Sequence, residues 1–197
     1  MAAMRRVCVF TGSSVGARPA YADAARALAA ALLERGLGLV YGGGSIGLMG
    51  VVADAVLAGG GEVIGVIPRP LATREIAHQG LADLRIVPSM HERKALMTEL
   101  ADGFVALPGG FGTFEELLEA ITWAQLGLHR KPIALLDVEG FYASLLALLD
   151  RATADGFVRP LYRGLVLDDV DPGRLLDRMA AQPPPAGLFS WIDRDES

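Results

Sequence analysis

VALPGGFGTFEELLEA, residues 105–120, joins an apolar run to a helical pattern through a loop that contains three glycines. Glycine costs backbone entropy on folding, and the adjacent carboxylates of Glu115 and Glu116 repel each other. An arrangement with both costs needs a compensating gain. Two interpretations are open at this point: the segment forms only a well-capped helix start, or a ligand lies against the turn.

The same order, an apolar run followed by a helical pattern, recurs along the chain. Several runs are apolar at every position, which is typical of strands covered on both faces. Strands that alternate with helices form parallel βαβ units in one sheet. The pattern predicts strands at residues 7–10, 37–41, 62–67, 84–87, 104–107, 133–137 and 165–167. It predicts helices at residues 19–36, 47–58, 90–101, 114–126, 141–154 and 173–181.

A chain of 197 residues is long enough for one domain with a buried core. We therefore predict an α/β fold with a doubly wound, mostly parallel, Rossmann-like sheet and helices on both faces. This single domain covers residues 1–182. Residues 183–197 begin with a PPP run and end in the acidic DRDES, so we expect a C-terminal tail without regular structure.

Three glycine clusters follow predicted strands: TGSSVG (11–16), YGGGSIG (41–47) and PGGFGT (108–113). Ligands of such sheets bind outside the carboxyl ends of the strands, so we expect all three clusters at one edge. Gly42, Gly44 and Gly47 match the dinucleotide pattern G-x-G-x-x-G. That pattern normally follows the first strand, with a carboxylate about 20 residues later for the ribose. Here it follows the second strand, and Glu62 begins the next strand rather than ending it. Close backbone packing, or contact with another nucleotide, is therefore favoured over NAD.

Composition argues against several classes of function. The formal net charge of −5 disfavours a nucleic-acid binder, which normally has a basic face. Residues 36–53 are uncharged over 18 positions, but seven of them are glycine, so we expect no membrane span. The single Cys8 lies in the apolar run RVCVF and indicates a buried, unreactive thiol in a reducing compartment. With no targeting segment in view, we expect a cytoplasmic protein. We expect no metal, since the sequence shows no Cys/His cluster.

The loop PGGFGTFEE carries the strongest signal. Thr113 and Glu116 have the T-x-x-E spacing of a capping box, which satisfies free amides at a helix start. Capping does not explain why Gly109, Gly110 and Gly112 occur together. A glycine loop that leads into a helix N-terminus lets several N–H groups converge on an anion, and the helix dipole favours negative charge there. A phosphate suits that place.

A second capping box, Ser89 to Glu92, opens the segment SMHERKALM. At 100° per residue, Arg93 shares a helix face with Met90, Met97 and Leu100. An arginine on an apolar stripe often extends its head group to the surface. This helix, however, precedes the strand that leads to PGGFGT, which would bring Arg93 near that loop. A guanidinium and a carboxylate beside a phosphate cradle suit a nucleotide with a reactive sugar.

SMHERKALM and PGGFGTFEE, together with GSSVG and YGGGSIGLMG, resemble the LOG (Lonely Guy) family, the cytokinin riboside 5′-monophosphate phosphoribohydrolases. The resemblance covers about residues 5–180. It implies hydrolysis of the N-glycosidic bond of an N6-modified adenosine 5′-monophosphate to free base and ribose 5-phosphate, with no cofactor. It also implies a homodimer, with Arg93 and Glu116 as the catalytic pair. The substrate-binding positions that it implies are Glu75, Arg93, Lys94, Gly110, Phe111, Gly112, Thr113, Phe114, Glu115, Glu116 and Thr122.

The residues fit this chemistry. Breaking a ribosyl C–N bond builds positive charge on the sugar, where a carboxylate stabilises it or activates water. Glu116 is the candidate for that role. The glycine loop would hold the 5′-phosphate, and Arg93 would orient the nucleotide and counter its charge.

Other functions also fit parts of the sequence. An AMP nucleosidase stays open, because a pocket for the N6 substituent is not visible in the sequence. A nucleotide or molybdenum-cofactor carrier of the same fold would bind a phosphorylated ligand in the same place, but would not need the pairing of Arg93 with Glu116. Proteins of this family often carry the label lysine decarboxylase. A pyridoxal phosphate enzyme needs a lysine for its Schiff base, and the chain offers only Lys94, in the ERK motif, and Lys131, just before a strand.

The helix after PGGFGT also predicts an assembly. We expect one face to cover the sheet, with Leu117, Leu118, Ile121 and Ala124. The other face would carry Ala120 and Trp123, which places an aromatic ring toward solvent. A lone exposed tryptophan is common, but tryptophan is enriched at interfaces. We expect a two-fold dimer in which this helix lies near its symmetry mate.

Overall fold

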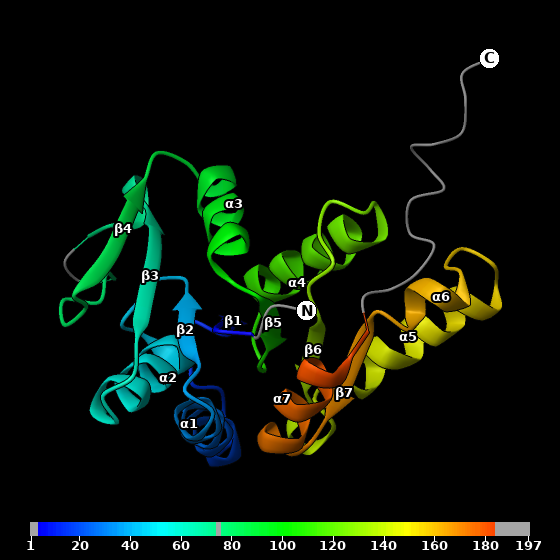
Figure 1. Cartoon of the computed structure of the whole chain (residues 1–197), viewed down its shortest axis with the longest axis horizontal. Helices are drawn as coiled ribbons and strands as arrows, with labels where there is room; N and C mark the ends of the chain where they lie inside the picture. Colours follow the sequence, from blue (N-terminus) through cyan, green and yellow to red (C-terminus); the bar gives the residue numbers. More distant parts are fainter. Residues whose placement is uncertain (1–3, 74–75, 184–197) are drawn as a thin grey trace.

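The computed structural model describes residues 4–73 and 76–183 of the chain (Figure 1). Within these residues, one sheet contains seven strands: β1 (Arg6–Phe10), β2 (Gly38–Tyr41), β3 (Val63–Pro68), β4 (Asp83–Val87), β5 (Gly103–Ala106), β6 (Ile133–Leu136) and β7 (Val166–Asp169). Their order is β4-β3-β2-β1-β5-β6-β7, and every neighbouring pair is parallel. The chain thus starts in the middle of the sheet, builds outward to β4, and resumes on the other side of β1 at β5.

Helices cover both faces of the sheet (Figure 1). One face is covered by α1 (Pro19–Glu34), α2 (Gly47–Ala58) and α7 (Pro172–Ala181). The other face is covered by α3 (Met90–Leu100), α4 (Phe111–Gln125), α5 (Ala143–Ala154) and the short α6 (Pro160–Arg163). Two single turns of 3₁₀ helix, η1 (Arg69–Leu71) and η2 (Val138–Gly140), lie in connections.

Side chains of the central strands alternate between two apolar cores, as the pleat requires. Val7 and Val9 of β1 pack in the core beneath α1 and α2, whereas Cys8 and Phe10 pack in the core beneath α3 and α4. The thiol of Cys8 is fully buried, as predicted, and burial raises its pKa. Because both faces are covered, the strands are apolar at almost every position.

The strand order reverses between β1 and β5, and this position determines where a ligand can bind. In open α/β sheets, the loops at such a switch point diverge to opposite faces and leave a crevice at the carboxyl edge. The loop after β1 leads to α1 on one face, and the loop after β5 leads to α4 on the other. The first and third glycine clusters therefore flank the crevice.

The predicted fold class is confirmed, and every predicted strand is present with ends that differ by one or two residues. The four-residue α6 was missed. The capping role predicted for Ser89 is confirmed, because its Oγ accepts a hydrogen bond from the N–H of Glu92 (3.2 Å). Apart from Pro183, the predicted tail lies outside the described residues. In the part of the chain that the structure describes, no helix is long and apolar enough to cross a membrane.

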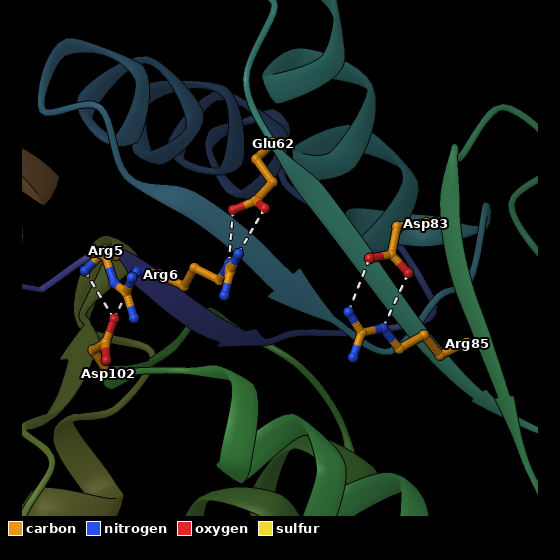
Figure 2. A network of polar contacts seen from close by, with 6 residues as sticks. All are labelled: Arg5, Arg6, Glu62, Asp83, Arg85 and Asp102. Carbon is orange, nitrogen blue, oxygen red and sulfur yellow. Dashed lines mark hydrogen bonds and ion pairs between the residues drawn. The ribbon is translucent and has the colours of Figure 1, made fainter.

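Two ion pairs lie toward the amino edge of the sheet, one between β1 and the residue before β3 and one within β4 (Figure 2). Arg6 on β1 donates two hydrogen bonds to Glu62 (2.7 and 2.8 Å), and Arg85 on β4 donates two to Asp83 (both 3.0 Å). The carboxylate of Asp102 accepts a hydrogen bond from the backbone N–H of Arg6 (3.0 Å). Glu62 thus lies at the edge opposite the glycine clusters, which agrees with the argument against NAD.

Candidate active site

The three glycine clusters meet at the carboxyl edge of the sheet, as predicted. The N–H of Gly12 donates to the carbonyl of Pro108 (3.2 Å), and the N–H of Leu48 in α2 donates to the carbonyl of Gly12 (3.0 Å). A cavity of about 290 Å³ opens beside them. Residues 12–16 and 108–110 line it together with Leu48, and the rings of Tyr21 and Phe141 complete its wall.

Two glycines of the second cluster are required by close packing. Gly47 has φ +63°, and a Cβ added there would lie 2.2 Å from the carbonyl carbon of Ser13. A Cβ added at Gly42 would lie 2.0 Å from Nη2 of Arg93. The G-x-G-x-x-G pattern therefore serves packing, as one of the two interpretations proposed, and one of the packed groups is a charged side chain.

Arg93 is buried on the sheet-facing side of α3, with 9% of its surface exposed. Its Nε donates to the carbonyl of Val66 in β3 (3.0 Å), and its Nη1 donates to Oε1 of Glu116 in α4 (2.8 Å). The alternative that the head group extends to the surface is therefore wrong. On the predicted stripe, Met97 is also buried, whereas Met90 is 42% exposed.

Glu116 is the buried partner of Arg93, with 8% of its surface exposed. Burial raises the pKa of Glu116 above its ordinary value, and the charge and hydrogen bond of Arg93 partly oppose this rise. Carboxyl groups whose pKa is raised in this way are frequent at catalytic sites, because they exchange protons closer to neutral pH. The carboxylate of Glu116 can also stabilise positive charge that develops next to it.

Helix α4 begins at Phe111, one turn before the predicted start. Gly110 is the N-cap, and no side chain of the described residues caps the helix. The predicted capping box of Thr113 and Glu116 is therefore wrong. Glu116 lies in the second turn and points to Arg93, while Thr113 is buried in the first turn. The hydroxyl of Thr113 packs so closely on the preceding loop that a Cβ added at Gly109 would lie 2.1 Å from Oγ1.

Residues 110–112, at the start of α4, lie at an exposed surface. The first N–H groups of an α-helix have no acceptor within the helix and carry its positive dipole end. A Cβ added at Gly110 or at Gly112 would meet no atom of the described residues within 4 Å. The glycines therefore leave open space at the helix start, as the predicted anion-binding role of the loop requires.

Lys94 follows Arg93 on α3 and crosses to α4 beside the first ion pair. Its Nζ contacts carboxylate oxygens of both Glu115 and Glu119, the latter at 2.9 Å. The side chain of Lys94 is only 10% exposed. The family resemblance predicts Lys94 and Glu115 as substrate contacts; within the chain, they contact each other.

Comparison with known proteins decides the family. A family model described as "Possible lysine decarboxylase" matches residues 49–179. The chain is 50% identical over 180 residues to cytokinin riboside 5′-monophosphate phosphoribohydrolase LOG7 of Arabidopsis thaliana, which spans 91% of this chain and 83% of that protein. It is 51% identical over 180 residues to LOG2 of the same plant, spanning 91% and 84%. The chain belongs to the LOG family.

Solved structures share the fold of this LOG family member at lower identity. The molybdenum cofactor binding protein of the phototrophic bacterium Rippkaea orientalis has a TM-score of 0.69 and 19% identity, over 92% of this chain and 98% of that one. The molybdenum cofactor carrier protein of Chlamydomonas reinhardtii has a TM-score of 0.66 and 20% identity, over 90% and 99%. At such identities the likeness shows the fold only.

The positions that the LOG resemblance named fall into three groups. Arg93, Lys94 and residues 110–116 are brought together at the carboxyl edge. Within that group, Phe111 is 93% exposed, and Phe114 packs its ring on Phe141 with centroids 6.3 Å apart. Thr122 lies on the outer side of α4, where its hydroxyl donates to the carbonyl of Leu118 (2.7 Å), and it is not brought to the others. Glu75 lies outside the described residues.

The predicted faces of α4 need three corrections in this LOG chain. Leu118, predicted against the sheet, is 43% exposed, and Ala120, predicted toward solvent, is 4% exposed. Trp123 is half-buried and lines a small recess with Lys94 and Glu116. The buried stripe of the helix is therefore rotated from the expected one.

Sequence reasoning missed the roles of Gly42 and Glu119. Gly42 was noted only as part of a dinucleotide pattern, and no sequence feature near Gly42 indicates its contact with Arg93. Glu119 did carry a signal, since it stands four residues after Glu115 and therefore on the same side of the helix. In the described ranges, no group of three or more His, Cys, Asp or Glu side chains could hold a metal ion.

Proposed function

We propose that the chain hydrolyses the N-glycosidic bond of N6-modified adenosine 5′-monophosphates to the free base and ribose 5-phosphate. The observation that carries this proposal is the buried pair of Arg93 and Glu116 beside an open, glycine-lined helix start. Relatives at about half identity over most of the chain are named for this reaction.

In the proposed mechanism, Glu116 acts on the sugar. As the bond from C1′ to the base nitrogen breaks, its electron pair leaves with the base and positive charge builds on the ribose. The carboxylate of Glu116 stabilises that charge or activates the water whose oxygen bonds to C1′. One water proton remains on the new hydroxyl group, and the other balances the departing base. Arg93 holds Glu116 ionised and orients the nucleotide.

The amides at the start of α4 are proposed to hold the 5′-phosphate. Support comes from the open approach to Gly110 and Gly112 and from the cavity lined by residues 108–110. Phosphate contacts that strengthen in the transition state would contribute to kcat as well as to affinity. Phe111, exposed at the same helix start, is a proposed contact for the nucleotide.

The residues do not fit pyridoxal phosphate chemistry, despite the description of the family model. Such an enzyme needs a lysine amine that is free to form a Schiff base. Lys94 is held by Glu115 and Glu119, and Nζ of Lys131 donates to the carbonyl of Thr98 (2.5 Å). The sequence has no third lysine that could form the Schiff base.

A homodimer is proposed from the outer side of α4. Phe111, Leu118 and Thr122 follow one another at seven and four residues, which places them on one stripe of the helix. Phe111 and Leu118 are 93% and 43% exposed. A second copy packed on this stripe would cover both. It would also bring Thr122 of the second copy toward the site of the first copy, which the first copy's own Thr122 does not reach.

We also propose that the protein is cytoplasmic, which the buried Cys8 supports.

The test is to incubate the purified chain with N6-isopentenyl-AMP, AMP and N6-isopentenyladenosine, and to follow base release by chromatography. We expect rapid release from the N6-modified monophosphate and far slower release from the nucleoside. Equal kcat/KM for nucleoside and monophosphate would reject the phosphate site. Preference for AMP would indicate an AMP nucleosidase, and tight binding without cleavage would indicate a carrier.

A further inference from the structure

Three ion pairs cross the seam between α3 and α4. Arg93 faces Glu116, with 2.8 Å between Nη1 and Oε1. The neighbouring Lys94 contacts Glu115 and also Glu119, with 2.9 Å between Nζ and Oε1 of the latter. The cations occupy consecutive positions of α3, and the carboxylates all belong to α4. Lys94, Glu116 and Glu119 also line one recess, so a displacement of the ammonium changes the surroundings of Glu116.

Glu119 is the less exposed of the two carboxylates that contact Lys94. Burial lowers the pKa of Lys94, and the hydrogen bonds to Glu115 and Glu119 more than offset this, so that the pKa is raised overall. One carboxylate would balance one ammonium, and two carboxylates four residues apart on a helix repel each other. The side chain of Glu115 is 53% exposed, whereas that of Glu119 is 24% exposed. With Glu115 as its sole partner, Lys94 would be drawn toward solvent.

We propose that Glu119 is a positioning residue, which anchors Lys94 in the seam so that the ammonium keeps the carboxylate of Glu116 ionised and directed at Arg93. Glu119 then acts on the reaction through Lys94. Its kinetic consequence rests on the proposed function, but the anchoring of Lys94 does not.

The charges around Glu116 determine the sign of the expected effect. Burial raises the pKa of Glu116; Arg93 lowers it, Glu115 raises it, and Lys94 lowers it. Among the described residues, the charged and titratable groups that face Glu116 are Arg93 and Lys94 of α3, Glu115 and Glu119 of α4, and the buried thiol of Cys8 in β1.

Removing the charge of Glu119 distinguishes two ways in which it could change the pKa of Glu116: by positioning Lys94, or by its own negative charge. Deleting a nearby negative charge by itself lowers the pKa of a carboxyl group. If Glu119 acts through Lys94, the substitution Glu119→Gln instead raises the pKa of Glu116, because the ammonium moves away. The two mechanisms therefore predict shifts of opposite sign.

The experiment titrates Glu116 by carbon NMR of protein labelled at the glutamate carboxyl groups, with Glu116→Gln to assign the signal. We compare the unmodified chain with Glu119→Gln, Lys94→Met and the double variant. Glu62→Gln is the matched control, because it breaks the ion pair with Arg6 at the opposite edge of the sheet (Figure 2). The titration does not depend on turnover, so it tests the positioning role even if the proposed reaction fails.

We expect the midpoint of Glu116 to rise in Glu119→Gln and in Lys94→Met, and to stay unchanged in Glu62→Gln. With N6-isopentenyl-AMP, Glu119→Gln should lower kcat/KM by up to about a hundredfold, the scale of a small displacement at a reactive site. It should also move the acid limb of the pH profile upward. In the Lys94→Met background, Glu119→Gln should lower kcat/KM little further. An unchanged or lowered midpoint in Glu119→Gln, or full additivity of the two substitutions, would overturn the proposal.

Discussion

The contact between Gly42 and Arg93 can be tested by adding one methyl group. Gly42 is not among the glycines with positive φ, so alanine fits the backbone and the effect comes from the side chain. The added Cβ would lie 2.0 Å from Nη2 and 3.2 Å from Cζ of Arg93, and 3.3 Å from Sδ of Met49. To reach ordinary contact, the guanidinium must retreat by about 1 Å or more. That movement strains its hydrogen bonds to Val66 and Glu116 (3.0 and 2.8 Å).

The expected loss of stability in Gly42→Ala follows from the burial of the ion pair between Arg93 and Glu116. Breaking a buried ion pair while its other charge stays buried costs about 3–5 kcal/mol. We take this as the upper limit for Gly42→Ala, because the guanidinium is displaced rather than removed. At about 2–4 °C per kcal/mol for a chain of this size, Tm should fall by up to about 6–20 °C. Displacement of this preorganised charged group should lower kcat/KM by up to about 10²–10³-fold, the effect of removing such a group.

The assay combines thermal unfolding by circular dichroism with base release from N6-isopentenyl-AMP. Gly164→Ala is the matched control, because Gly164 has φ −67° and the nearest atom to an added Cβ is at an ordinary 3.4 Å. In an Arg93→Met background, Gly42→Ala should cost little further, since the clashing atom is gone. If Gly42→Ala keeps the Tm and kcat/KM of the unmodified chain, the contact with Arg93 does not constrain the site.

Further predictions concern catalysis, pH, assembly and the tail. Glu116→Gln should lower kcat by about 10²–10³-fold, and near-normal turnover would exclude its proposed role. Since burial raises the pKa of Glu116, the acid limb of kcat/KM should have its midpoint above the ordinary 4.5; a midpoint at or below that value would contradict the raised pKa. The same raised pKa means that the contribution of Glu116 to stability is full below its unfolded pKa and is lost as pH rises through the folded value. Light scattering should give twice the chain mass, and half of that for Leu118→Glu, with the exposed Leu148→Glu as control; a variant that stays dimeric would move the interface elsewhere. A chain ended at Gln182 should keep the kcat/KM of the full chain, and a large loss would assign the tail a role.

Much of the fold could be predicted because its determinants are local. Buried parallel strands are apolar on both faces, and the glycine clusters stand directly at strand ends, so both the sheet and its functional edge can be recognised from short windows. The start of α4 could not be recognised in this way. Gly110 caps the helix without a side chain, whereas the T-x-x-E spacing at Thr113 imitates a cap that the fold does not use.

Contacts between distant segments explain the other omissions. Gly42 and Arg93 are far apart in sequence, and Lys94 and Glu119 belong to different helices. The pairing of Arg93 with Glu116 was expected from the family resemblance, but its burial and its hydrogen bond to Val66 were not. No periodicity in either helix specifies which side chains of the other it will face.

The error in the faces of α4 shows why hydrophobic patterns fail at this site. Its buried residues are Thr113, Glu116, Leu117, Ala120 and Ala124, which follow the spacing i, i+3, i+4, i+7 and i+11 of a single helix stripe. Ranking by hydrophobicity favours Leu118 instead, because the true stripe contains a carboxylate and small residues. A carboxylate in a buried stripe destabilises the fold unless a cation meets it there, and that cation comes from α3. The hydrophobic pattern therefore fails at the turn of α4 where a charged side chain, Glu116, is buried in place of an apolar one. Such local inconsistencies between sequence pattern and fold are expected at functional sites.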